Sequence, residues 1–137
     1  MGSRTADVFF YGLFMDQELL RGKGLSPQRA DLASVDGFAL RIGQRAALVP
    51  RPGSRVHGVV VSLTLAELDR LYSEPSVRAY KPQAVLARLA AGGVIAALCY
   101  NLTQPPLPNE RNPEYASKLR AVAEKTGLPA EYVESIQ

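Results

Sequence analysis

The chain has 137 residues, of which 47% are hydrophobic and 21% are charged, with 11 glycines and 10 prolines. This is the length of about one domain and the usage of ordinary globular proteins, which excludes collagen-like, disordered and coiled-coil classes. The net charge of +3 comes from 16 Lys and Arg scattered among 13 Asp and Glu. Without a basic run, no nucleic-acid partner is expected. We expect one domain over residues 1–137, with residues 1–6 as candidates for disorder.

Several residue types exclude further classes. No apolar run approaches the roughly 18 residues that a membrane helix needs, and the N-terminus lacks the apolar core of a secretory signal. We therefore expect no membrane partner and a cytoplasmic location. Cys99 is the only cysteine, which excludes an internal disulfide, and its apolar neighbours predict a buried side chain. With His57 as the only histidine, a metal site or a Cys–His dyad would lack ligands, and no metal is expected.

The first half of the chain predicts strands with one short helix. Residues 8–11 form an aromatic and β-branched run with apolar residues on both parities, which predicts a central strand that ends at Gly12. Asp16 is a helix N-cap, and the helix should end at Gly22-Lys23-Gly24. This glycine–lysine segment resembles part of a phosphate-binding loop, but it follows a helix and lacks the earlier glycine, so nucleotide binding is rejected.

Three further strands should follow over residues 30–63. The pattern from residue 30 to 42 is strand-like, with a bulge or bend at Asp36-Gly37. Residues 46–49 and 56–63 are also β-prone, and Pro52-Gly53 between them predicts a turn. Because parallel crossovers need a dozen or more residues, these short connections predict antiparallel pairing.

The second half of the chain alternates helices and strands. Thr64 to Glu67 is a capping box that opens a helix to about Tyr72. Residues 82–89 and 94–101 predict a hairpin. A proline-rich connection leads to Asn112-Pro113, the N-cap and first residue of a helix that Gly127 ends, and a short helical turn follows. About six strands and three or four helices predict an α+β domain with a closed or partly closed sheet.

Two features could carry chemistry. Gly12 permits a positive φ and close approach of a ligand, so the amides of Leu13 and Phe14 could bind a carboxylate; a plain tight turn is the commoner interpretation. Glu74 follows the capped helix among apolar neighbours, which disfavour a charged carboxylate and so suit a general base; a solvated loop residue is the commoner alternative. The tyrosines expected in the core are Tyr80, Tyr100, Tyr115 and Tyr132.

Taken in order, these segments resemble the γ-glutamylcyclotransferase (AIG2-like) family over residues 8–136. Residues 9–16 are similar to its Tyr-Gly-Ser/Thr-x-Met entry, and residues 58–63 are similar to its central strand. The remaining matches are a helix carrying Leu-Asp, the Val77-x-x-Tyr80 motif, a strand hairpin and a terminal helix with Tyr115.

The resemblance implies a small mixed, mostly antiparallel β-barrel flanked by helices, with a pocket at its mouth. It further implies an enzyme that converts a γ-glutamyl amine or γ-glutamyl amino acid to 5-oxoproline and the free amine, without metal or organic cofactor. Mapped onto this chain, Glu74 would be the catalytic base, and the turn formed by Tyr11, Gly12, Leu13 and Phe14 would hold the glutamyl carboxylate. Tyr115 would orient the substrate or the carboxylate of the base. A monomer or a homodimer is expected.

Two positions depart from the family pattern. The family acid commonly follows as Leu-Asp-x-x-Glu-Gly, which puts Tyr72 in that slot here and Glu74 two residues later. Leu13 replaces the usual Ser or Thr. Two alternatives therefore stay open: a small-molecule binding protein that keeps the fold without the reaction, and an enzyme acting on a γ-glutamyl isopeptide in a protein, which a wide and shallow pocket mouth would favour.

Overall fold

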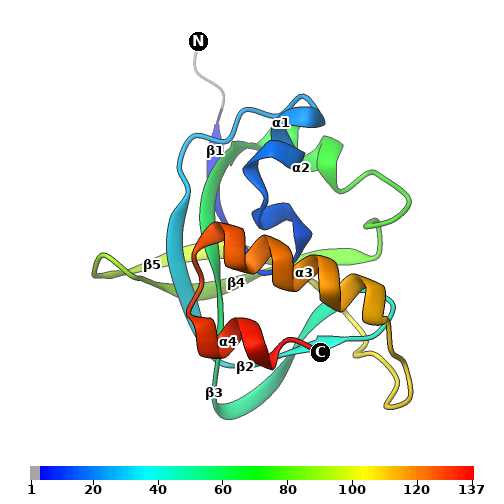
Figure 1. Cartoon of the computed structure of the whole chain (residues 1–137). Helices are drawn as coiled ribbons and strands as arrows, with labels where there is room; N and C mark the ends of the chain where they lie inside the picture. Colours follow the sequence, from blue (N-terminus) through cyan, green and yellow to red (C-terminus); the bar gives the residue numbers. More distant parts are fainter. Residues whose placement is uncertain (1–3) are drawn as a thin grey trace.

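The computed structural model describes residues 4–137 and shows five strands that close into a barrel in the order β1-β3-β2-β4-β5 (Figure 1). The predicted α+β class is confirmed. Every strand pair is antiparallel except β1 with β5, which is parallel. The strands are β1 (Thr5–Phe10), β2 (Asp31–Ile42), β3 (Ala46–Thr64), β4 (Tyr80–Leu89) and β5 (Val94–Leu102).

Strand β1 is the central strand that its apolar run predicts. It pairs with β3 along its whole length, from Thr5 opposite Thr64 to Phe10 opposite Val59, and it meets β5 at Val8. From Val8 onward its side chains are almost fully buried. Thr5 and Ala6, which the sequence makes candidates for disorder, pair with β3, whereas residues 1–3 lie outside the described residues.

The predicted turn at Pro52-Gly53 does not divide two strands. Both flanking segments pair with the same partner, β2, so that β3 runs unbroken through 19 residues. The register shifts between Asp36 and Phe38, which pair with Arg55 and Pro50, so residues 51–54 bulge opposite Gly37. Gly37 and Gly53 both take a positive φ there. The barrel therefore has five strands instead of about six, and the bend expected at Asp36-Gly37 is confirmed as this bulge.

Four α-helices and a one-turn 3-10 helix cover the barrel. Their bounds are η1 (Leu13–Met15), α1 (Gln17–Gly22), α2 (Leu65–Leu71), α3 (Pro113–Thr126) and α4 (Ala130–Ser135). The predicted caps are confirmed: Asp16 accepts a hydrogen bond from the Glu18 amide, and Thr64 and Glu67 form the reciprocal capping box. Gly127 ends α3 in the left-handed conformation that favours glycine. In Figure 1, α3 lies across one side of the barrel beside α4, and α1 and α2 lie together at one end.

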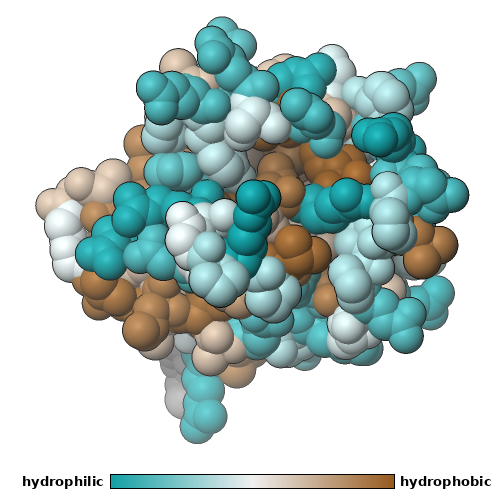
Figure 2. Space-filling view, turned by 90° about the horizontal axis from the view of Figure 1, so that it is seen from below, coloured by the Kyte–Doolittle hydropathy of each residue, from teal (hydrophilic) through white to brown (hydrophobic). Residues whose placement is uncertain are grey.

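One hydrophobic core joins the barrel to α3, where Leu119 and Ala123 are fully buried. Cys99 is also fully buried, as predicted. The outward side of the β4–β5 hairpin is apolar instead of polar, since Leu86 and Val94 remain 69% and 50% exposed. Figure 2 shows apolar groups gathered on that side of the molecule. Among residues 4–137, no helix has the length and apolar character needed to cross a bilayer.

Candidate functional site

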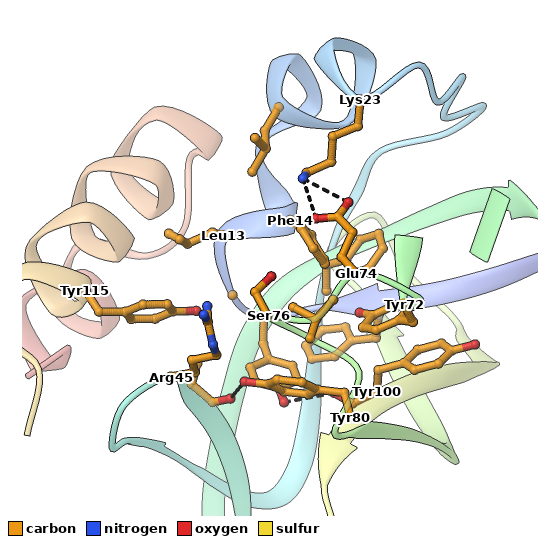
Figure 3. Close-up of a pocket in the computed structure, with 17 residues that line it drawn as sticks. Leu13, Phe14, Lys23, Arg45, Tyr72, Glu74, Ser76, Tyr80, Tyr100 and Tyr115 are labelled. Carbon is orange, nitrogen blue, oxygen red and sulfur yellow. Dashed lines mark hydrogen bonds and ion pairs between the residues drawn. The ribbon is translucent and has the colours of Figure 1, made fainter. Parts of the chain in front are cut away.

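The candidate site is a cavity of about 210 Å³ beside the end of β1 (Figure 3). It gathers the turn after β1, the end of α1, the β2–β3 turn, the loop after α2 and one residue of α3. Every site residue predicted from the sequence lines this single cavity. Its lining consists of Phe9, Phe10, Tyr11, Gly12, Leu13, Phe14, Leu19, Lys23, Arg45, Ala46, Tyr72, Glu74, Ser76, Val77, Tyr80, Tyr100 and Tyr115.

The turn after β1 lines the cavity through Gly12, Leu13 and Phe14. Gly12 is the N-cap of η1, and its carbonyl accepts a hydrogen bond from the Met15 amide at 3.0 Å. Leu13 and Phe14 are the first two residues of η1. The first amides of a helix have no carbonyl partner within the helix. The expected positive φ at Gly12 is wrong, because its φ is −112°. Glycine is still required by close approach, since a Cβ there would lie 3.2 Å from Tyr115 Oη.

Tyr115 reaches this turn from the first turn of α3. Asn112 caps that helix by accepting a hydrogen bond from the Tyr115 amide at 3.1 Å, which fixes where the tyrosine leaves the helix. Burial raises the pKa of Tyr115. This rise is partly offset by hydrogen bonds from the amides of Ala46 and Leu13 and by the charge of Arg45. The hydroxyl therefore lies among groups that favour negative charge. This corner of the cavity suits an anion.

Glu74 lies in the same cavity and is held by a lysine. Lys23 Nζ contacts both carboxylate oxygens, at 2.8 and 3.0 Å. The two side chains are 29% and 36% exposed, so the pair is open to solvent on one side. Lys23 also lies 6.0 Å above the centre of the Phe14 ring. The surroundings of Glu74 thus include a cation as well as the apolar neighbours expected from the sequence.

Tyr72, which the expected family pattern puts in the slot of its acid when counted without a gap, forms part of the cavity wall. It is the C-cap residue of α2, and its ring stacks on Tyr100 and meets the edge of Phe14 at 5.8 Å. Burial raises its pKa well above the ordinary tyrosine value, as do the nearby Cys99, Tyr100, Tyr80 and Tyr115. A neutral aromatic group therefore occupies that slot at physiological pH.

Hydrogen bonds hold the buried side of the cavity. Tyr11 donates to the Tyr100 carbonyl at 2.9 Å and to Asn101 Oδ1 at 3.3 Å. Asn101 in turn bonds both the amide and the carbonyl of Leu48, each at 2.9 Å. Tyr80 donates to the Ala46 carbonyl. Burial raises the pKa of both Tyr11 and Tyr80, so these hydroxyls act as hydrogen-bond donors.

Sequence reasoning missed Lys23 and Arg45 as site residues. Lys23 stands 51 positions from Glu74, and its sequence neighbours indicated only a rejected phosphate loop. Arg45 lies just before β3 in the β2–β3 turn, where a surface arginine is unremarkable. Nothing short of the fold brings either side chain to the cavity. Ser76, also missed, lies two residues after the candidate base and could have been included with its loop.

Other candidate chemical groups lie outside this cavity. Tyr132, on α4, packs against His57 with ring centroids 4.9 Å apart. Burial raises the pKa of Cys99 to about 12, so its thiol stays protonated. No group of three or more His, Cys, Asp or Glu side chains within residues 4–137 could hold a metal ion.

Comparisons with solved structures identify the same architecture. A structure described as gamma-glutamyl cyclotransferase is 22% identical, with a TM-score of 0.78 over 98% of this chain and 89% of that chain. An uncharacterized protein from Homo sapiens is 24% identical, with a TM-score of 0.76 over 97% and 88% of the two chains. An AIG2-like protein from Mus musculus is 17% identical, with a TM-score of 0.57 over 82% of each. At such identities the likeness establishes the fold.

Sequence comparison supplies the family. A search of curated protein sequences found no significant match. The model of the gamma-glutamyl cyclotransferase, AIG2-like family, however, matches residues 8–119, which include the turn after β1, the loop carrying Glu74, and Tyr115. This match covers well over half of the chain, and the chain therefore belongs to the gamma-glutamyl cyclotransferase, AIG2-like family.

Proposed function

We propose that the protein is a γ-glutamylcyclotransferase that cyclises a small γ-glutamyl compound to 5-oxoproline and releases the amine. One observation carries the proposal: Glu74 and the turn residues Gly12, Leu13 and Phe14 line one cavity. These are the two groups that the reaction needs, a base for the α-ammonium and an anchor for the α-carboxylate. Family membership supports the reaction type.

The proposed reaction is an intramolecular acyl transfer. Glu74 takes a proton from the substrate's α-ammonium, and the free amine attacks the γ-carbonyl carbon to close a five-membered ring. The carbon–nitrogen bond to the leaving amine then breaks as Glu74 returns the proton to that nitrogen. The ring nitrogen gives up a second proton, and the amine departs with both protons as an ammonium ion. Because the nucleophile belongs to the substrate itself, the protein mainly has to hold the glutamyl chain in a folded, reactive geometry.

The anchoring groups would set that geometry. In the proposal, the α-carboxylate binds the Phe14 amide and the Tyr115 hydroxyl, which in turn accepts a hydrogen bond from the Leu13 amide. Lys23 would hold the Glu74 carboxylate through its two hydrogen bonds until the substrate's ammonium arrives. The aromatic wall formed by Tyr72 and Tyr100 would pack against the methylene groups of the glutamyl chain.

Removal of the base tests the proposal directly. Glu74→Gln keeps the shape of the side chain but cannot take a proton, so we expect at least a hundredfold loss of 5-oxoproline release. Purified protein would be incubated with γ-glutamyl amines, γ-glutamyl amino acids and γ-glutamyl-ε-lysine, and product followed by mass spectrometry. Glu134→Gln, which changes the same charge at an exposed position of α4, is the control. Full activity of Glu74→Gln would overturn the assignment.

A second candidate is a binding protein that retains the pocket without the reaction. Two points favour it: counted without a gap, the family pattern puts Tyr72 in the slot of its acid, and Glu74 is engaged by Lys23. Calorimetry with the same panel separates the two functions. Binding without product would establish the second candidate. A cytoplasmic location, and a monomer or homodimer, remain predictions for fractionation and light scattering.

A further inference from the structure

We infer that Arg45 selects substrates whose leaving amine carries a carboxylate, so that γ-glutamyl amino acids are preferred over neutral γ-glutamyl amines. The inference rests on the proposed function, because it takes the glutamyl group to be anchored by the turn after β1. It adds a specificity residue to that site and names the substrate class.

The charges around the cavity support this substrate class. Three charged side chains line it, namely Lys23, Arg45 and Glu74. Positive groups therefore exceed negative ones by one. A γ-glutamyl amino acid has two carboxylates and one ammonium, so it carries the opposite net charge, whereas a γ-glutamyl alkylamine is neutral. Complementary charge between a cavity and its ligand is a general source of specificity.

Arg45 is the cation left for a ligand. Lys23 is already engaged by both oxygens of Glu74. Within residues 4–137, by contrast, no carboxylate forms an ion pair with Arg45. A guanidinium presents paired donors in a plane that matches the two oxygens of a carboxylate. An arginine that lines a cavity without an acidic partner is thus suited to a carboxylate on the bound molecule.

Arg45 lies at the rim of the cavity, because it is an exposed residue that also lines the cavity. Its guanidinium lies next to the Tyr115 hydroxyl, which also belongs to the cavity lining (Figure 3). Figure 3 shows Arg45 beside Tyr115, away from the pair formed by Lys23 and Glu74. The proposed function assigns the α-carboxylate to the turn after β1, and on that assignment Arg45 is left for a second carboxylate.

Two matched ligands test the inference. L-γ-Glutamyl-L-alanine and L-γ-glutamyl-L-alaninamide differ only in the carboxylate of the leaving group, and both retain the α-carboxylate. For the wild-type protein we expect about a tenfold preference for the acid, the size typical of one charge-assisted hydrogen bond. The preference is measured as kcat/KM for 5-oxoproline release, and as Kd by calorimetry if no product forms.

Substitution of Arg45 then tests whether this residue is the source of the preference for the acid. Arg45→Gln should lower kcat/KM for γ-glutamylalanine, or its affinity if no product forms, about tenfold. The same value for γ-glutamylalaninamide should change less than twofold. Arg45→Lys should restore part of the loss. Arg51→Gln removes the same charge from an exposed site on β3 outside the cavity, and it should behave as wild type. If Arg45→Gln weakens both ligands equally, the arginine contacts the α-carboxylate or supports the fold, and the inference is wrong.

The two proposals fail in different ways. If both ligands yield 5-oxoproline with equal efficiency, the proposed function stands and the role of Arg45 is refuted. If neither yields product but the acid binds tenfold more tightly through Arg45, the specificity inference stands and the cyclotransferase activity is refuted. If neither ligand is bound or converted, both proposals fall.

Discussion

Tyr72 stacks face to face on Tyr100, with ring centroids 3.8 Å apart and ring planes only 7° apart. The stack joins the end of α2 to β5, two elements that share no backbone hydrogen bonds. Tyr72 also contacts Phe14 from the turn after β1. Tyr72 therefore holds together three segments of the cavity wall.

The stack predicts the effects of two substitutions at Tyr72. Tyr72→Ala removes the stacked ring and should lower the free energy of unfolding by about 3 kcal/mol. Tyr72→Phe keeps the ring and should cost less than about 1 kcal/mol, because no hydrogen bond to this hydroxyl forms within residues 4–137. Urea denaturation followed by circular dichroism would measure both. Equal losses in the two variants would show that the hydroxyl, and not the stacked ring, stabilises this wall.

Lys23→Met should affect activity more than stability. The ion pair with Glu74 is about one-third exposed, so its loss should change the free energy of unfolding by less than about 1 kcal/mol. Loss of the two hydrogen bonds that orient Glu74 should lower kcat about tenfold. Lys23→Arg, which retains the charge and the donors, should recover part of this rate. A Lys23→Arg variant as slow as Lys23→Met would argue against an orienting role.

Gly58→Ala should be strongly destabilising. A Cβ at this position would collide with the backbone carbonyl of Phe10 on the neighbouring strand. Since backbone cannot move aside as a flexible side chain does, we expect a loss of about 3 kcal/mol. Gly22→Ala is the matched control, because a Cβ there meets nothing within 4 Å. It should be neutral or slightly stabilising, and a similar loss in both variants would contradict the steric explanation.

The capping box of α2 predicts a specific response to acid. Burial raises the pKa of Glu67. Its carboxylate, however, accepts hydrogen bonds from the amides of Thr64 and Ser26, at 2.8 and 2.7 Å, and these lower the pKa by more than burial raises it. A carboxyl group with a lowered pKa stabilises the fold fully above its unfolded pKa, near 4.5, and loses that contribution as the pH falls through its folded pKa. Below pH 4.5, stability should therefore decrease.

Glu67→Gln isolates this contribution, because glutamine does not titrate. We expect wild type to exceed Glu67→Gln in stability at pH 7 by up to about 1 kcal/mol, and the gap to close as the pH falls below 4.5. Thermal unfolding at pH 7, 5, 4 and 3 would follow it, with Glu134→Gln expected to track wild type throughout. A gap that stays constant with pH would rule out titration of Glu67 as its source.

Local sequence signals predicted the individual elements well. Asp16, Thr64 and Asn112 each cap the helix that their sequence context predicts, because capping depends on residues within one turn. The number of strands was wrong for a reason of longer range. Pro52-Gly53 does bend the chain, but only the common partner β2 makes the two flanking segments one strand.

The candidate site divides in the same way. Gly12 and Glu74 were identified from their own surroundings in the sequence, and both line the cavity. The partner of Glu74 was not identified, since Lys23 reaches it only after the barrel closes. Arg45 was missed because an isolated arginine in a turn has no local pattern, and its significance comes entirely from the groups that the fold places around it.

Asn101 makes the interior beside the cavity more rigid than the cavity entrance. Its amide group meets both the N–H and the C=O of Leu48 as another peptide would, and so ties β5 to β3, two strands that are not neighbours in the barrel. This internal brace keeps opposite walls at a fixed separation. The cationic residues at the entrance, in contrast, are supplied by connecting segments. Residues at the rim can therefore be exchanged, and the range of bound molecules altered, while the braced interior of the barrel stays unchanged.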